Sequence, residues 1–128
     1  CRVCFSAPLA KLLEGADRGT VYVRVDYTDK SGRVYHNNYC LDKQKNMNYP
    51  KVDLQTEVRS IEGGYEVTVS TDKFARAVCL SVADNESVYS DNYFDVQPKS
   101  SVQVQVRTRL SAEAFNASLR LTCLNNEF

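Results

Sequence analysis

The stretch Tyr89-Ser90-Asp91-Asn92-Tyr93-Phe94-Asp95 decides the fold, because it lies between two runs in which every second residue is apolar. Valine alternates with polar residues in the following run, residues 101–109, and valine and leucine alternate in the same way in the preceding run, residues 74–82. This alternation predicts half-buried antiparallel strands. We expect the aromatic stretch, which is followed by Pro98, to form a fixed corner of a β-sandwich and not a catalytic loop.

The same period of two recurs along the chain in short segments, which is typical of an all-β protein with an antiparallel sandwich. The expected strands are residues 2–6, 20–28, 33–41, 52–59, 65–69, 74–82, 101–109 and 117–124. Asp29-Lys30-Ser31-Gly32 and Gly63-Gly64 predict turns. Residues 8–13 predict one helical turn. Residues 111–116 form either a helical turn opened by Ser111 or a loop.

The polar segment 42–50 predicts a linker that divides the chain. Residues 49–128 contain enough expected strands for a complete sandwich. Residues 1–48 supply about three, too few to close a second one, so we expect them to be the trailing part of a preceding β-domain. The chain begins at Cys1 with no methionine or signal sequence, which predicts a segment excised from a longer protein.

Composition argues against two classes of partner. Sixteen basic and sixteen acidic residues give a net charge of zero, so no field of one sign exists to attract nucleic acid or an anionic membrane. No apolar run approaches the roughly 20 residues that span a bilayer.

Five cysteines are an odd number for a disulfide framework. On the expected strands Cys123 points into the core and Cys79 points away from it, which places them poorly for a bridge. We expect free thiols. Cys1-x-x-Cys4 has the spacing of half a zinc site, but a structural site needs four ligands, so we expect no metal there.

Other candidate sites have simpler explanations. His36 is the only histidine, and no serine motif accompanies it, which argues against a catalytic triad. Four acidic residues cluster at Asp84, Glu86, Asp91 and Asp95, but their spacing fits no calcium loop, and a chain of this size offers no deep cleft for a glycosidase carboxylate pair. Outward-facing Tyr22, Tyr35 or Tyr39 could form a platform for a sugar ring. Asn85 and Asn116 each open a glycosylation triplet.

One family shares the central stretch. Phe74-Ala75-Arg76 and the run Tyr89 to Val96 with Pro98 resemble the C-terminal immunoglobulin-like domain of β-mannosidases, in glycoside hydrolase family 2. The family pattern there is Phe-Ser-Asp-Asn-Tyr-Phe-Asp-Leu-Leu-Pro-Gly-Glu. Here Tyr89 and Val96 replace a Phe and a Leu, and Lys99-Ser100 replaces Gly-Glu. The motif positions that match are Ser90, Asp91, Asn92, Tyr93, Phe94, Asp95 and Pro98.

The resemblance implies an immunoglobulin-like sandwich over residues 49–128 and a non-catalytic accessory role in a β-mannosidase. The family's two catalytic glutamates lie in a (β/α)₈ barrel with no counterpart here, so no catalytic residue and no cofactor are expected in this chain. The implied partners are other domains of the parent enzyme and mannose-containing glycans. Two alternatives remain open: an independent carbohydrate-binding module, and a structural or adhesive immunoglobulin-like domain.

Overall fold

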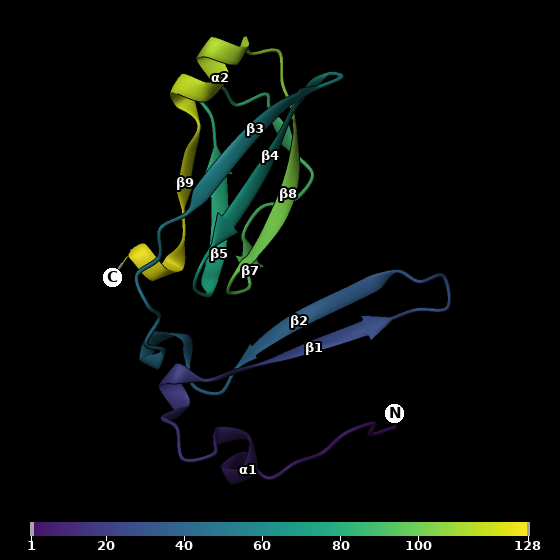
Figure 1. The fold of residues 1–128 in the computed structure, drawn as a ribbon, viewed down its shortest axis with the longest axis vertical. Helices are drawn as coiled ribbons and strands as arrows, with labels where there is room; N and C mark the ends of the chain where they lie inside the picture. The colour runs from purple at the N-terminus through teal and green to yellow at the C-terminus, as the bar shows by residue number, and fades with distance from the viewer. Residues whose placement is uncertain (1, 128) are drawn as a thin grey trace. The chain divides into compact units, whose positions relative to one another are not determined.

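The computed structural model describes residues 2–127 and divides into two compact units, Cys1–Asn48 and Tyr49–Phe128 (Figure 1). No helix within residues 2–127 is long and apolar enough to cross a membrane.

The first unit is built on one β-hairpin. Its elements are α1 (Leu9–Leu13), η1 (Arg18–Thr20), β1 (Tyr22–Thr28), β2 (Val34–Cys40) and η2 (Gln44–Asn46). The antiparallel register runs from Tyr22 opposite Cys40 to Thr28 opposite Val34. The turn closes as expected, because Asp29 Oδ1 accepts from the Ser31 amide at 2.8 Å and Gly32 adopts a φ of +85°.

One expectation for this unit was wrong. Residues 2–6 form no strand, and Val3 and Phe5 are 79% and 77% exposed, because alternation alone provides no neighbouring strand to pair with. The division between the two units falls after Asn48, within the polar segment 42–50. Asp42 accepts hydrogen bonds from the Lys43 amide and from Asn46 Nδ2, and η2 forms within this segment.

The second unit is an antiparallel β-sandwich, as predicted. Its strands are β3 (Gln55–Ile61), β4 (Gly64–Thr71), β5 (Ala75–Ser81), β6 (Val88–Tyr89), β7 (Phe94–Val96), β8 (Ser100–Arg107) and β9 (Arg120–Thr122). One sheet has the order β3-β4-β8-β6 and the other has the order β7-β5-β9. The two-residue turn after β3 is Glu62-Gly63, one position earlier than predicted. Gly64 begins β4 at a place where a Cβ atom would lie 1.9 Å from the Val106 carbonyl oxygen.

The apolar faces of the two sheets form one core. Its fully buried members are Val67, Val69, Ala75, Val78, Leu80, Val96, Val104, Val106, Phe115 and Cys123. Helix α2 (Ala112–Ser118) covers one end of the sheets (Figure 1), and the ring of Phe115 stacks on Tyr65 at 4.2 Å. The Tyr65 hydroxyl donates to the Leu110 carbonyl at 2.8 Å, so its polar end is also satisfied within the sandwich.

The segment after β8 resolves one alternative and corrects one prediction. Ser111 opens a helix, because its hydroxyl accepts from the Ala114 amide at 3.2 Å in an N-cap geometry. The helix continues to Ser118, so the predicted strand 117–124 shrinks to Arg120–Thr122. The final turn is η3 (Leu124–Asn126).

Candidate functional site

The central stretch lies beside β5, which has an irregular backbone. The register of β5 against β7 shifts between Ala75 and Val78, and Ala77 adopts a φ of +51°. Such a bulge removes amides from the regular ladder, and a buried amide without a partner costs about 1–3 kcal/mol. The amides and carbonyls along this edge therefore need other partners.

Side chains of the central stretch supply those partners. Asn92 Oδ1 accepts from the Leu80 amide at 2.7 Å, and Asn92 Nδ2 donates to the Leu80 carbonyl at 2.9 Å. Asp95 Oδ1 accepts from the Ala77 amide at 3.0 Å, and its other oxygen pairs with the Arg76 guanidinium. These side chains therefore bond to the parts of β5 where its regular pairing with β7 is interrupted or has ended.

Two further contacts connect the stretch to its surroundings. The Tyr89 hydroxyl accepts from the Val82 amide at 3.1 Å. Ser90 pairs with Gln105 of β8: the Ser90 amide donates to the Gln105 carbonyl at 2.8 Å, and Ser90 Oγ accepts from the Gln105 amide at 2.9 Å. Because β5 and β8 belong to different sheets, the central stretch bonds to both layers of the sandwich.

The two adjacent aromatics have opposite environments. Phe94 is 9% exposed and belongs to the core, whereas Tyr93 is 73% exposed at a φ of +58°. A hydrogen bond with Cys79 raises the pKa of the Tyr93 phenol. Asp91 is exposed and accepts from the Asn92 amide at 2.8 Å, so it serves the turn itself.

The turn after Pro98 also uses a left-handed backbone. Lys99 has a φ of +55°, and its amide donates to the Thr71 carbonyl at 2.9 Å. The family pattern has glycine at this position, which is the residue that adopts positive φ without steric cost. The turn therefore keeps its left-handed residue although glycine is absent.

Two asparagines that the sequence analysis missed connect distant segments. Asn125 is 3% exposed, and its amide group binds the Pro50 and Phe74 carbonyls at 2.8 Å each and the Arg76 amide at 2.7 Å. Asn126 binds both backbone groups of Val52. The only signal was an Asn-Asn pair after the last strand, which is usually a turn former.

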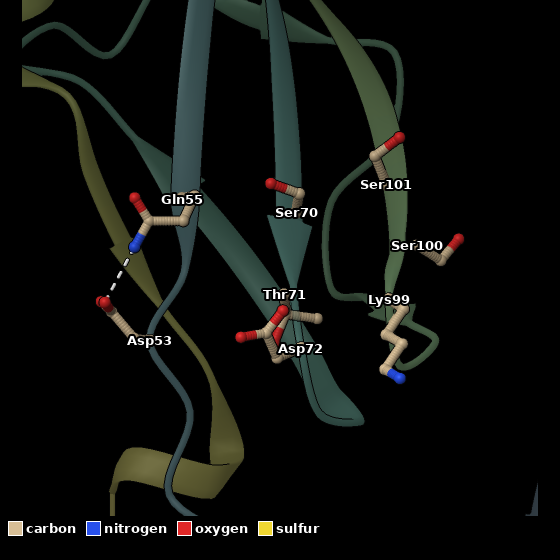
Figure 2. A pocket seen from close by; sticks show the side chains of 8 residues that line it. All are labelled: Asp53, Gln55, Ser70, Thr71, Asp72, Lys99, Ser100 and Ser101. Carbon is tan, nitrogen blue, oxygen red and sulfur yellow. Dashed lines mark hydrogen bonds between the residues drawn. The ribbon is translucent and has the colours of Figure 1, made fainter.

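A polar hollow of about 510 Å³ lies at one end of the β3-β4-β8 sheet (Figure 2). The residues around it are Asp53, Gln55, Ser70, Thr71, Asp72, Lys99, Ser100 and Ser101. Asp53 accepts from Gln55 Nε2 at 2.8 Å, the dashed contact in Figure 2. No residue of the stretch 89–95 contributes to this lining.

The remaining candidates are dispersed over the molecule. Cys4, Cys79 and Cys123 are free thiols, and Cys123 points into the core as predicted at 2% exposure. Cys1, the other half of the Cys-x-x-Cys pair, lies outside the described residues. Within residues 2–127, no group of three or more His, Cys, Asp or Glu side chains is placed to hold a metal ion.

The acidic cluster and the tyrosine set are also separated. Asp84 accepts from the Ser87 amide at 2.9 Å, whereas Asp95 of β7 pairs with Arg76 of β5. The two carboxylates therefore have separate partners. The β1–β2 register places Tyr35 and Tyr39 on one face of the hairpin and Tyr22 on the other. Tyr35 and Tyr39 therefore share a face that Tyr22 does not join.

Comparison with known proteins identifies a family for the second unit. The model of the family Ig_mannosidase, described as an Ig-fold domain, matches residues 48–127. A search of curated proteins found no match. The matched residues comprise more than half of the chain, including nearly all of the second unit and the whole central stretch. The chain therefore belongs to the Ig_mannosidase family of Ig-fold domains, which are found in β-mannosidase-like glycoside hydrolases.

Proposed function

We propose that this chain is a non-catalytic accessory region of a β-mannosidase of glycoside hydrolase family 2, an enzyme that removes β-mannose from glycans. The observation that carries the proposal is the family match over residues 48–127, together with the intact Ser-Asp-Asn-Tyr-Phe-Asp stretch. Catalysis is assigned to another part of the parent enzyme. The partners of this region are then the other domains of that enzyme.

Within this role, the motif from Ser90 to Pro98 acts as a structural corner. The side chains of Asn92 and Asp95 accept hydrogen bonds from backbone amides of β5, and the Ser90 hydroxyl accepts one from a backbone amide of β8. Phe94 fixes the corner in the core. These contacts would make the sandwich a rigid body, which is what a scaffold in a multidomain enzyme requires.

The first unit supports the assignment of residues 1–48 to a preceding sandwich. A two-stranded hairpin is marginally stable in water, and it needs further strands or another layer. On one face Val23, Val25 and Tyr27 lie opposite Tyr39, Asn37 and Tyr35. Val25, Tyr27 and Tyr39 are 58%, 63% and 68% exposed, so this face resembles the inner face of a sandwich whose other strands come from elsewhere in the parent.

The same face suggests a second function, glycan binding. The rings of Tyr27 and Tyr35 lie 6.2 Å apart, and Tyr39 is on the same side of the hairpin. Aromatic rings of this kind can stack on the apolar face of a sugar. The two functions compete for one surface, because a face covered by further strands cannot bind a ligand.

The deciding experiment is to read the coding sequence upstream of Cys1. We expect several hundred further residues with a (β/α)₈ pattern, two strand-end glutamates and additional strands just before residue 1. A start codon or a signal peptide directly upstream would overturn the accessory role. Titration of the ¹⁵N-labelled chain with mannobiose then tests the second function, because binding on the tyrosine face shifts the Tyr27, Tyr35 and Tyr39 amide resonances.

A further inference from the structure

The chain passes from the first unit to the second between Asn48 and Tyr49. Asn48, the last residue of the first unit, is held by a contact with Gly19. The Asn48 amide donates to the Gly19 carbonyl at 2.7 Å. A Cβ atom on Gly19 would lie 2.6 Å from the Asn46 carbonyl oxygen, so only glycine allows this close approach. Asp17 Oδ1 fixes the Gly19 amide at 2.7 Å.

Tyr49 and Pro50, the first two residues of the second unit, are held by contacts within the sandwich. The ring of Tyr49 lies 6.3 Å from that of Phe74. The carbonyl of Pro50 accepts from Asn125 Nδ2 at 2.8 Å. Proline at position 50 also biases Tyr49 toward an extended backbone. The side chain of Asn125 is buried and uses all of its polar atoms, because it also binds the Phe74 carbonyl and the Arg76 amide.

The next residue, Asn126, makes a similar contact two residues further along the entry, at Val52. Asn126 Oδ1 accepts from the Val52 amide at 3.1 Å, and Asn126 Nδ2 donates to the Val52 carbonyl at 2.9 Å. This double contact imitates the pairing of two residues in an antiparallel sheet. Val52 itself is 9% exposed and belongs to the core.

We propose that Asn125 and Asn126 form a latch that holds the entry of the sandwich, so that rotation between the two units is confined to the backbone of Asn48 and Tyr49. The latch connects segments that are 74 and 75 residues apart in the sequence. The entry segment is residues 50–52. With the entry segment held, movement of the first unit cannot spread into β3. This device goes beyond the proposed accessory role and does not depend on it.

Trypsin tests the latch directly, because the Lys51–Val52 bond lies inside the entry segment. In the full 128-residue chain we expect slow cleavage after Lys51. In Asn126→Ala the cleavage rate after Lys51 should rise at least about tenfold, since the entry segment opens without global unfolding. Asn126→Asp keeps the acceptor for the Val52 amide and loses only the donor, so its rate should lie between the two.

Two controls separate latch opening from unfolding. Asn116→Ala, on the exposed surface of α2, should leave the rate after Lys51 unchanged, and cleavage after Lys45 should be the same in all variants. Amide exchange at Val67 and Val104 should stay slow in Asn126→Ala. The proposal is overturned if the rate after Lys51 is unchanged in Asn126→Ala. It is equally overturned if the Val52 amide of the unmodified chain exchanges as fast as that of an exposed residue, a result that depends on no variant.

Discussion

The hairpin of the first unit and the sheets of the second have the same alternation of apolar residues, yet their side chains have opposite environments. Val25 on β1 is 58% exposed, whereas Val67 on β4 is fully buried. Both lie in strands with antiparallel partners. The difference is the second layer: the β7-β5-β9 sheet packs over Val67, and no described segment packs in this way over Val25. Alternation thus determines which side chains share a face, but a face is buried only where another layer covers it.

The largest difference in unfolding free energy is expected between the loss of a core ring, Phe94, and the loss of an exposed hairpin ring, Tyr27. Phe94→Ala should destabilise the sandwich by about 3–5 kcal/mol, because it leaves a cavity in the core. Tyr27→Ala should change the same unfolding transition by less than about 0.5 kcal/mol, because its ring is 63% exposed. Urea denaturation monitored by resonances of the second unit measures both. A loss below about 1 kcal/mol for Phe94→Ala would refute the corner role.

The second comparison is between Asn92, whose side chain hydrogen-bonds to the backbone of β5, and Asp91, whose side chain does not contact that strand. Asn92→Ala leaves the amide and the carbonyl of Leu80 without these partners and should cost about 2–3 kcal/mol. Asp91→Ala removes an exposed side chain next to it and should cost less than about 1 kcal/mol. Urea midpoints at constant m-value give both numbers. Equal losses would mean that the Asn92 contacts do not stabilise β5.

A smaller change, an increase in stability, is expected from a substitution in the turn at Lys99, which has a left-handed backbone. Lys99→Gly should stabilise the second unit by about 0.5–1 kcal/mol, because glycine relieves the left-handed strain at a φ of +55° by more than it adds to unfolded-chain entropy. Ser100→Gly at the start of β8 is the matched control, and it should destabilise by a similar amount. Thermal melts of the two variants should shift in opposite directions. A destabilised Lys99→Gly would show that the lysine side chain contributes more than the strain costs.

The smallest effect concerns alkaline pH. Burial raises the pKa of the Cys123 thiol, so the unfolded chain releases this proton at a lower pH than the folded chain. The stability from the protonated thiol is therefore fully present below the thiol pKa of the unfolded chain, and it is lost as the pH rises from that value through the higher thiol pKa of the folded chain. Comparing unfolding free energies at about pH 7 and about pH 9.5 should show a smaller decrease in Cys123→Ala than in the unmodified chain. An identical decrease would exclude this thiol as a cause.

The sandwich was largely predictable, because each of its strands has a clear apolar face and is bounded by turn residues. The predictions failed where local pattern competes with context. Residues 117–124 alternate like a strand, but the Ser111 cap starts a helix that continues to Ser118. Asn125 and Asn126 look like ordinary turn residues, since their partners at Pro50 and Val52 lie at the opposite end of the unit's sequence.

The sequence alone determined the all-β class and the antiparallel sandwich over residues 49–128. It also determined the inward face of Val104 and Val106 and the resemblance of the central stretch to the mannosidase domain. These depend on local alternation and on a contiguous motif, which a single chain displays directly. Only the tertiary structure showed that Asn92 and Asp95 bond to β5 where its regular pairing with β7 is interrupted or has ended, and that two asparagines hold the sandwich entry. A hydrogen bond between distant segments depends on the path of the whole backbone, and no local pattern contains that path.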